Sequence, residues 1–247
     1  MDVPVSAGKS PRTRIKMCGM TRVEDVRAAC ALGADAVGFV CAPSPRCVEA
    51  PRLAALAGAV APFVTPVLLF VNADADAVRA ALELVPNATL QFHGHENEDF
   101  CRSFGRPFVR AVPMAAGVDL LEFESRFASA QALLADTAHS KNPQSANPSV
   151  GGFGGSGRSF DWALLASAAR RRLPLVLAGG LDASNVGTAI AQCSPYAVDV
   201  SSGIEELHGN EVVRGIKSAS RMHDFIAAVR RADQRNAAMQ DKDRNPP

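Results

Sequence analysis

The chain has 247 residues, of which 47% are hydrophobic and 21% are charged, so it can bury a sizeable core as one domain. Length alone would also allow two domains, but no linker divides the middle of the chain. The formal net charge of +1 gives no argument for binding nucleic acid or an anionic membrane, so an anionic ligand would need a local site. No run approaches the roughly 18 apolar residues of a membrane span.

The cysteines and the two ends of the chain bear on the cellular compartment and on the bounds of the domain. Six cysteines form no CxxC motif and no metal-binding spacing with histidine, so we interpret them as reduced thiols of a cytoplasmic protein without a metal site. Residues 1–13 lack the apolar segment of a signal peptide and are expected to be a disordered extension. Residues 232–247 are charged and are expected to be a disordered tail. The domain itself is placed at 14–231.

Strand-like runs alternate with amphipathic stretches along the chain. Strands are predicted at 14–18, 35–40, 66–71, 88–92, 107–112, 132–136, 174–178 and 196–200. Helices are predicted at 23–32, 51–60, 75–85, 97–104, 118–129, 161–172, 183–192 and 212–230. Thr21 and Glu24 suggest a capping box for the first helix, and Ser184 or Asn185 could cap the seventh. Eight strand–helix units in about 250 residues indicate a single (β/α)₈ barrel of the α/β class. The alternative, a doubly wound sheet, would use fewer strands, and its GxGxxG motif is absent.

In such a barrel the active site lies at the C-terminal ends of the strands. Cys18 ends the first strand and Asp136 ends the sixth, so a thiol and a carboxylate could face each other and move a proton on and off a small substrate. Each residue also has a structural interpretation, since buried cysteines are often small hydrophobic residues and aspartate is common in turns. As a base, Cys18 would need a pKa below its ordinary value of about 8.5.

Small residues after the later strands predict a phosphate site. Barrels often bind phosphate in the loops after strands seven and eight, where exposed backbone N–H groups and a helix N-terminus suit a dianion. The alternative is that these glycines only make tight turns. The long polar segment 137–159 is expected to be disordered over 139–149 and to contact the ligand through its glycine-rich second half. The candidate phosphate residues are Gly155, Ser156, Gly157, Gly179, Gly180, Ser201, Ser202 and Gly203.

Four further polar residues lie on or after the predicted strands. Arg46 is a candidate clamp for a carboxylate or, alternatively, solvated surface. His93 could line the site or be a structural histidine. Strand alternation places Lys16 on the same face as Cys18. Because the first and eighth strands are neighbours in a closed barrel, Lys16 and Asp199 could form a pair inside it.

Taken in order, these segments resemble the phosphoribosylanthranilate isomerase family of tryptophan biosynthesis over about residues 14–230. The segments that carry the resemblance are Lys-Met-Cys-Gly-Met-Thr (16–21), Gly-Ala-Asp-Ala-Val-Gly-Phe-Val (33–40), Ser-Pro-Arg (44–46), Leu-Gln-Phe-His-Gly (90–94), Leu-Leu-Ala-Asp-Thr (133–137), Gly-Gly-Ser-Gly-Arg-Ser-Phe-Asp-Trp (154–162), Leu-Ala-Gly-Gly-Leu (177–181) and Val-Asp-Val-Ser-Ser-Gly-Ile-Glu (198–205).

The resemblance implies a single barrel without a cofactor that acts on a small phosphosugar, with no nucleic-acid or membrane partner, as a monomer or homodimer. The implied reaction is an Amadori rearrangement. Asp136 would be the general acid that opens the ribose ring, and Cys18 the general base that removes the C2′ proton. Arg46 would hold the anthranilate carboxylate, and the glycine-rich loops would hold the phosphate.

The chain departs from the family pattern in four places. Met17 replaces the usual isoleucine, and Cys47 stands where an aromatic residue is common. Segments 139–149 and 207–214 are lengthened. Two other functions remain open at this point: a phosphosugar-binding barrel without turnover, and the related histidine-pathway isomerase. The latter uses two aspartates, whereas the first strand here ends in cysteine.

Overall fold

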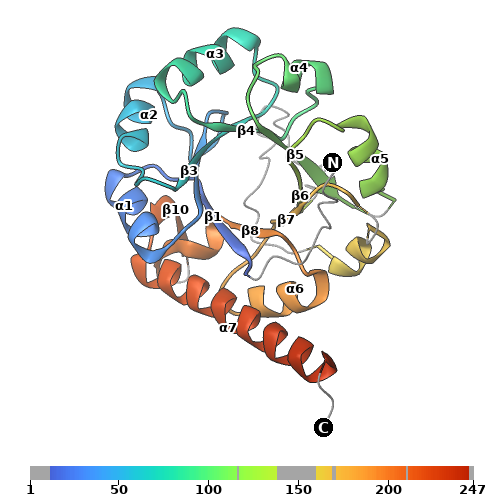
Figure 1. The fold of residues 1–247 in the computed structure, drawn as a ribbon. Helices are drawn as coiled ribbons and strands as arrows, with labels where there is room; N and C mark the ends of the chain where they lie inside the picture. Colours follow the sequence, from blue (N-terminus) through green and yellow to red (C-terminus); the bar gives the residue numbers. More distant parts are fainter. Residues whose placement is uncertain (1–11, 116, 138–159, 169–170, 210, 245–247) are drawn as a thin grey trace.

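A computed structural model describes residues 12–115, 117–137, 160–168, 171–209 and 211–244. Eight parallel strands close into a barrel in the order β1 to β8, and helices surround it (Figure 1). The predicted (β/α)₈ barrel is therefore confirmed, and each strand lies where it was predicted with small shifts at its ends. The strands are β1 Arg14–Cys18, β2 Ala36–Val40, β3 Thr65–Phe70, β4 Thr89–Phe92, β5 Phe108–Met114, β6 Ala132–Thr137, β7 Leu175–Leu177 and β8 Ala197–Val200.

The helices follow the predicted order; the first has the predicted bounds, and the others differ from their predicted bounds at one or both ends. They are α1 Val23–Leu32, α2 Ala50–Ala57, α3 Ala75–Leu84, α4 Glu98–Arg102, α5 Leu120–Arg126, α6 Val186–Cys193 and α7 Ala219–Arg244, with the 3₁₀ helices η1 Trp162–Ala168 and η2 Ser202–Ile204. The helix predicted at 161–172 is thus a 3₁₀ helix. The one predicted at 212–230 is wrong in its first part.

An antiparallel hairpin replaces that first part. Its strands are β9 Glu205–His208 and β10 Glu211–Lys217. Gly215 has a φ of 84°, which ordinary residues rarely adopt and which an α-helix excludes. The preceding Val212 and Val213 are β-branched residues that favour strands. The extra residues 207–214 therefore lie within a hairpin that contacts the start of α1 through Thr21, Arg22 and Asp25.

Parts of the two segments predicted to be disordered are ordered where the structure describes them. The expected disordered tail from 232 instead continues α7 to Arg244, in a sequence rich in alanine, glutamine and arginine, which favour helix. Thr13, placed in the predicted disordered extension, is buried. Its backbone N–H and hydroxyl both donate to the carboxylate of Asp233, at 2.9 and 2.6 Å. These two hydrogen bonds join the residue before β1 to the C-terminal helix α7.

The capping box predicted for α1 is wrong, and the cap predicted for α6 is confirmed in position only. The N-cap of α1 is Arg22, without a side-chain hydrogen bond, because the Thr21 hydroxyl donates to the carbonyl of Gly215 instead. At α6, Asn185 is the N-cap residue but its side chain does not cap the helix. The Asn185 amide donates to the carbonyl of Gly180 and accepts from the N–H of Asp182. These side chains fix loops at the C-terminal end of the barrel.

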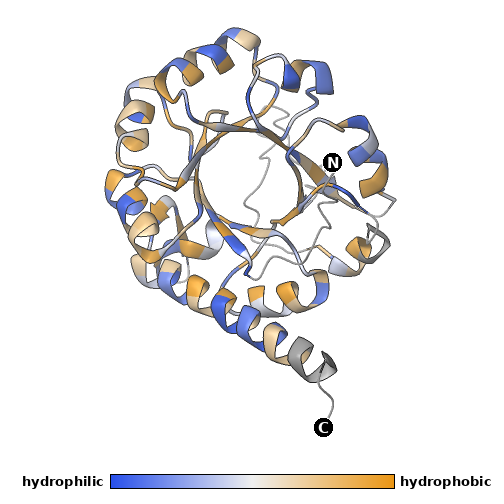
Figure 2. Cartoon of the chain, in the orientation of Figure 1, coloured by the Kyte–Doolittle hydropathy of each residue, from blue (hydrophilic) through white to orange (hydrophobic). Residues whose placement is uncertain are grey.

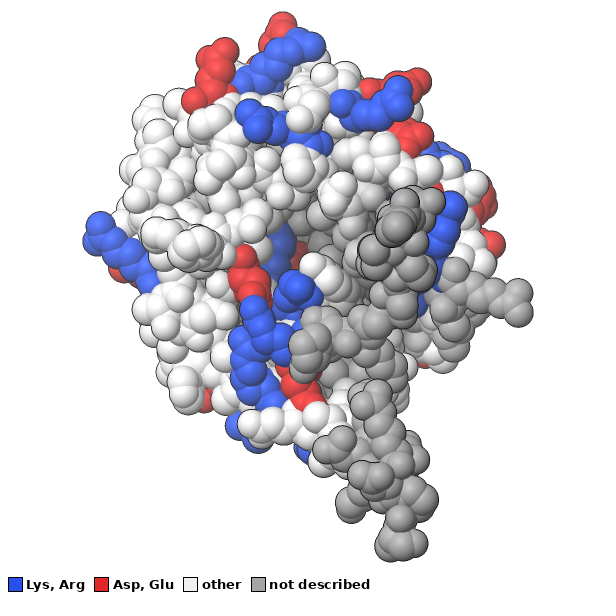
Figure 3. Space-filling model, viewed as in Figure 1, with Lys and Arg blue, Asp and Glu red and all other residues white. Residues whose placement is uncertain are grey.

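Hydrophobic residues lie along the strands, and hydrophilic residues lie on the outer helices (Figure 2). Alternation along β1 shows how the layers form: Ile15 and Met17 belong to the core beneath the helices, while Lys16 belongs to the barrel interior, where it pairs with β8. Charges of both signs intermix on the face seen in Figure 3, without a broad area of one sign. Within the described ranges, no helix combines the length and apolar character needed to cross a membrane.

Candidate active site

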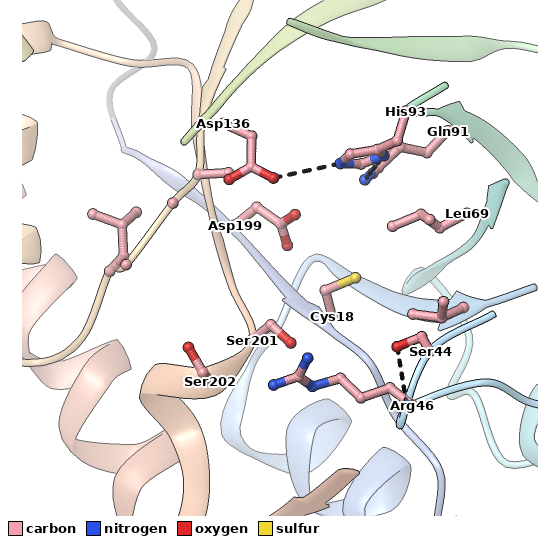
Figure 4. A pocket seen from close by; sticks show the side chains of 15 residues that line it. Cys18, Ser44, Arg46, Leu69, Gln91, His93, Asp136, Asp199, Ser201 and Ser202 are labelled. Carbon is pink, nitrogen blue, oxygen red and sulfur yellow. Dashed lines mark hydrogen bonds and ion pairs between the residues drawn. The ribbon is translucent and has the colours of Figure 1, made fainter. Parts of the chain in front are cut away.

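A pocket opens at the C-terminal ends of the strands, where the sequence predicted the site. Figure 4 shows Cys18, His93 and Asp136 arranged around it, with Arg46, Ser201 and Ser202 on one side. Gly203 does not line it, and Gly155, Ser156 and Gly157 fall outside the described residues, as does 139–149. The lining residues are Cys18, Val40, Ser44, Arg46, Leu69, Gln91, His93, Asp136, Ala178, Gly179, Gly180, Leu181, Asp199, Ser201 and Ser202.

The thiol of Cys18 lies in space left by a glycine on the next strand. Cys18 pairs in register with Gly38 of β2. A Cβ atom on Gly38 would lie 2.7 Å from the sulfur of Cys18 and 3.2 Å from the Nζ atom of Lys16. Gly38 therefore makes room for a thiol and an ammonium group side by side.

The hypothesis that Lys16 and Asp199 pair inside the barrel is confirmed. Lys16 Nζ donates to Asp199 Oδ2 at 2.9 Å, and both side chains are buried. The other oxygen, Asp199 Oδ1, is buried without a hydrogen-bond partner among the described residues. Because Asp199 lines the pocket, its carboxylate has hydrogen-bonding capacity left beside the space for a ligand.

The electrostatic environment of Cys18 differs from the expectation. Burial raises the pKa of the Cys18 thiol. Lys16 lowers it through its charge and a hydrogen bond, but Asp199 raises it again, and the net direction is upward. The lowered pKa that a base needs is thus not what the surroundings of the Cys18 thiol produce, because the sequence showed neither the depth of burial nor the carboxylate behind Lys16.

Asp136 lies across the pocket from Cys18 and next to His93 (Figure 4). His93 Nε2 is 3.6 Å from Asp136 Oδ2, and the N–H of Thr137 donates to Asp136 Oδ1 at 2.8 Å. The amide nitrogen of Gln91 lies 3.4 Å from His93 Nδ1. If that amide donates, His93 directs its Nε2 proton toward Asp136. Sequence reasoning did not single out Gln91, although it precedes His93 within the Leu-Gln-Phe-His-Gly segment.

Arg46 is buried and held by two residues that sequence reasoning missed. Its Nε and Nη2 atoms donate to the two carboxylate oxygens of Glu205, at 2.6 and 2.7 Å. Lys217 donates to the same carboxylate at 3.2 Å. The solvated-surface alternative for Arg46 is therefore wrong. Glu205 ended the recognisable Ser-Ser-Gly-Ile-Glu segment, but Lys217 lay within a predicted helix and gave no signal.

The two glycines after β7 adopt a conformation that favours glycine. Gly179 and Gly180 have φ angles of 84° and 63°. A Cβ atom on Gly179 would collide with Thr137 and lie 3.1 Å from Asp136 Oδ1. Gly179 therefore serves close packing against Asp136 as well as exposing backbone.

Gly203 lies where the loops after β7 and β8 pack together. A Cβ atom there would collide with the backbone carbonyl of Leu181, so the glycine lets the loops after β7 and β8 pack together. Its carbonyl accepts two hydrogen bonds from Arg221, at 3.2 and 3.1 Å.

We therefore expect Gly203→Ala to destabilise the protein by about 1–3 kcal/mol, the usual effect of forcing a methyl group into a packed site. Thermal unfolding measures this directly. Gly58→Ala is the matched control, because Gly58 has a φ of −65° and its added Cβ would make only ordinary contacts. Equal unfolding temperatures for the two variants would contradict this role.

Among the described residues, no group of His, Cys, Asp and Glu side chains is arranged to hold a metal ion. What the pocket does offer is a thiol, a carboxylate, an arginine and exposed backbone around one space. Such a site can bind an anion and transfer protons at two points of a small molecule.

Known proteins resemble this chain over nearly its whole length. The family model of N-(5'-phosphoribosyl)anthranilate (PRA) isomerase matches residues 15–228. A relative from Methylibium petroleiphilum, N-(5'-phosphoribosyl)anthranilate isomerase, is 49% identical over 228 residues, which are 92% of this chain and 98% of the relative. The protein of the same name from Dechloromonas aromatica is 46% identical over 90% of this chain and 99% of its own length.

Solved structures agree. Phosphoribosyl anthranilate isomerase from Thermus thermophilus has a TM-score of 0.74 and 32% identity, covering 89% of this chain and 99% of its own. Another structure of this enzyme, in complex with reduced 1-(o-carboxyphenylamino)-1-deoxyribulose 5-phosphate, has a TM-score of 0.72 and 30% identity, covering 88% and 98%. With the barrel and the pocket described above, these matches show that the chain belongs to the N-(5'-phosphoribosyl)anthranilate isomerase family.

Proposed function

We propose that this chain catalyses the Amadori rearrangement of N-(5-phosphoribosyl)anthranilate to 1-(2-carboxyphenylamino)-1-deoxyribulose 5-phosphate, with Asp136 as general acid and Cys18 as general base. Membership of the isomerase family supports the reaction. The observation that carries the assignment of roles is the position of the two groups, a carboxylate and a thiol on opposite sides of one pocket.

The reaction needs a proton at one point and removes one at another. Asp136 donates a proton to the furanose ring oxygen, and the ring opens to a Schiff base. The thiolate of Cys18 then removes the C2′ proton, giving an enolamine that tautomerises to the product. Lys16 is the cation beside the thiol and favours the thiolate, which offsets part of the cost of burial.

The rest of the pocket serves binding in this proposal. Arg46 holds the anthranilate carboxylate with the part of its guanidinium that Glu205 does not use. The carboxylate of Asp199 accepts a hydrogen bond from a sugar hydroxyl. His93 lines the site beside Asp136. The phosphate is bound by the loops that carry Gly155, Ser156, Gly157, Gly179, Gly180, Ser201, Ser202 and Gly203.

Loss of phosphoribosylanthranilate fluorescence on addition of the purified protein tests the function. We expect the wild type to turn over this substrate and the Cys18→Ser variant to lose that activity. Binding without turnover would favour the phosphosugar-binding barrel instead. Turnover of the histidine-pathway substrate alone would favour the related isomerase.

Assembly and location remain predictions. A structural neighbour from Thermotoga maritima is a monomer derived from a dimeric isomerase. For this chain we propose a monomer or homodimer in the cytoplasm, acting on a small phosphosugar and not on nucleic acid. Analytical ultracentrifugation measures the state of association.

A further inference from the structure

A buried cluster of three charged side chains lies behind one wall of the pocket. Arg46 follows β2, Glu205 begins β9 and Lys217 ends β10. Their side chains are 6%, 0% and 0% exposed. Lys217 also donates to the carbonyl of Ser201 at 2.9 Å and lies 3.4 Å from its hydroxyl. Only Arg46 and Ser201 of this group line the pocket, so Lys217 has no direct contact with a ligand there.

The cluster contains two cations and one carboxylate. Arg46 and Lys217 share Glu205, whose remaining hydrogen bond comes from the backbone of Gly215 at 2.8 Å. The neighbouring charges are already paired: Arg22 binds the carboxylate of Asp25. Lys16 likewise binds Asp199. Within the described residues, one positive charge of the cluster therefore lacks a partner.

The backbone around Lys217 is fixed as well. Its N–H donates to Asp25 at 3.0 Å, and its carbonyl accepts from Arg22 at 3.0 Å. On the other side, a Cβ atom on Gly19, whose φ is 76°, would lie 2.6 Å from the Cδ atom of Arg46. The stem of Arg46 thus lies directly against the backbone, and its head is oriented before any ligand arrives. Such preorganisation reduces the entropy cost of binding.

We propose that Lys217 is a positioning residue for carboxylate recognition: through Glu205 it locks Arg46, and the charge it adds to the buried cluster is balanced by the carboxylate of the substrate. This inference rests on the proposed function and extends it to a residue of the lengthened hairpin. Because Lys217 does not line the pocket, its contribution is to the affinity for the anion and not to proton transfer.

The titration of Lys217 supports this arrangement. Burial, with the charge of Arg46, lowers the pKa of Lys217 to about 8 in spite of Glu205. The groups that face it are Glu205, Arg46, Ser201 and the thiol of Cys18. Added negative charge nearby favours the protonated form, so binding of a carboxylate near pH 8 should be accompanied by uptake of a proton.

Calorimetry with two ligands tests the proposal: the reduced product analogue, and the same molecule made from aniline, which lacks the carboxylate. Lys217→Met should weaken binding of the carboxylated analogue by about tenfold or more, as for loss of a charge-assisted interaction. Binding of the analogue without carboxylate should change far less. The matched control is Arg172→Met, which removes a cation that is 82% exposed, pairs with Glu124 and does not line the pocket. This variant should weaken neither ligand.

Equal weakening of both ligands in Lys217→Met would overturn the proposal, because it would indicate a role in phosphate binding or in folding. If the Lys217→Met variant does not fold, proton uptake by the wild-type protein tests the proposal instead. Titrations near pH 8 in two buffers of different ionisation enthalpy should show proton uptake with the carboxylated analogue and none with the other. Identical proton uptake for both would overturn the inference. Failure of the wild type to bind the carboxylated analogue at all would overturn the proposed function with it.

Discussion

Cys18→Ser and Asp136→Asn should each lower kcat by about 10²–10⁴-fold, the usual contribution of a positioned base or acid. Serine keeps the shape of the cysteine but has a hydroxyl that is far harder to ionise. Asparagine keeps the shape of the aspartate but has no proton to donate at the ring oxygen. Steady-state kinetics with the fluorescent substrate measures the loss, and circular dichroism shows whether each variant is folded.

The double variant distinguishes a joint mechanism from two separate effects. Residues that act as a unit are non-additive, so it should be little slower than the slower single variant. Cys101→Ser is the matched control, because Cys101 is as deeply buried as Cys18 but lies on α4, away from the pocket. A folded Cys18→Ser protein with near wild-type turnover would contradict the mechanism while leaving the fold untouched.

The pKa of Cys18 is shifted in a definite direction, which is upward. Burial disfavours the thiolate and outweighs the help from Lys16, so the pKa of Cys18 in the free protein lies above its ordinary value. The ultraviolet absorbance of the thiolate, taken as the difference between wild type and Cys18→Ser, should therefore increase only in alkaline solution. A thiolate already formed at neutral pH would show that the positive groups around it dominate.

Local sequence patterns were enough to predict the barrel. Each barrel strand is a short apolar run that is followed by small or polar residues. Both features can be recognised from residues that are adjacent in the sequence. For the same reason Cys18 and Asp136 could be chosen as strand-end residues. Their positions needed no knowledge of packing, because the barrel brings all strand ends to one face.

What could not be predicted depends on contacts between distant segments. Glu205 and Lys217 are brought to Arg46 by a hairpin, and the pattern of 212–217 alone also fitted a helix. The hydroxyl of Thr21 bonds to Gly215, 194 residues away, instead of capping its own helix. The pKa of Cys18 depends on Asp199, which lies on another strand. Such tertiary effects override local preference.

The second large effect should come from Gly38→Ala, although residue 38 carries no reactive group. The added methyl group would lie 2.7 Å from the sulfur of Cys18 and 3.2 Å from Lys16 Nζ, so one of them must move. A misplacement of about 1 Å in a catalytic group can cost on the order of 10²-fold in rate. We therefore expect a loss in kcat of about that size, measured with the same assay.

Binding should distinguish displacement of the base from a general disruption of the site. The atoms nearest to the added methyl group belong to Cys18 and Lys16, and not to Arg46 or Ser201. The reduced product analogue should therefore still bind with nearly wild-type affinity. Overpacking should cost about 1–3 kcal/mol of stability, which thermal unfolding measures. Gly58→Ala, outside the pocket, should change neither rate nor binding. If Gly38→Ala turned over substrate at the wild-type rate, the thiol would not need the position it occupies, and Cys18 would lose its assignment as the base.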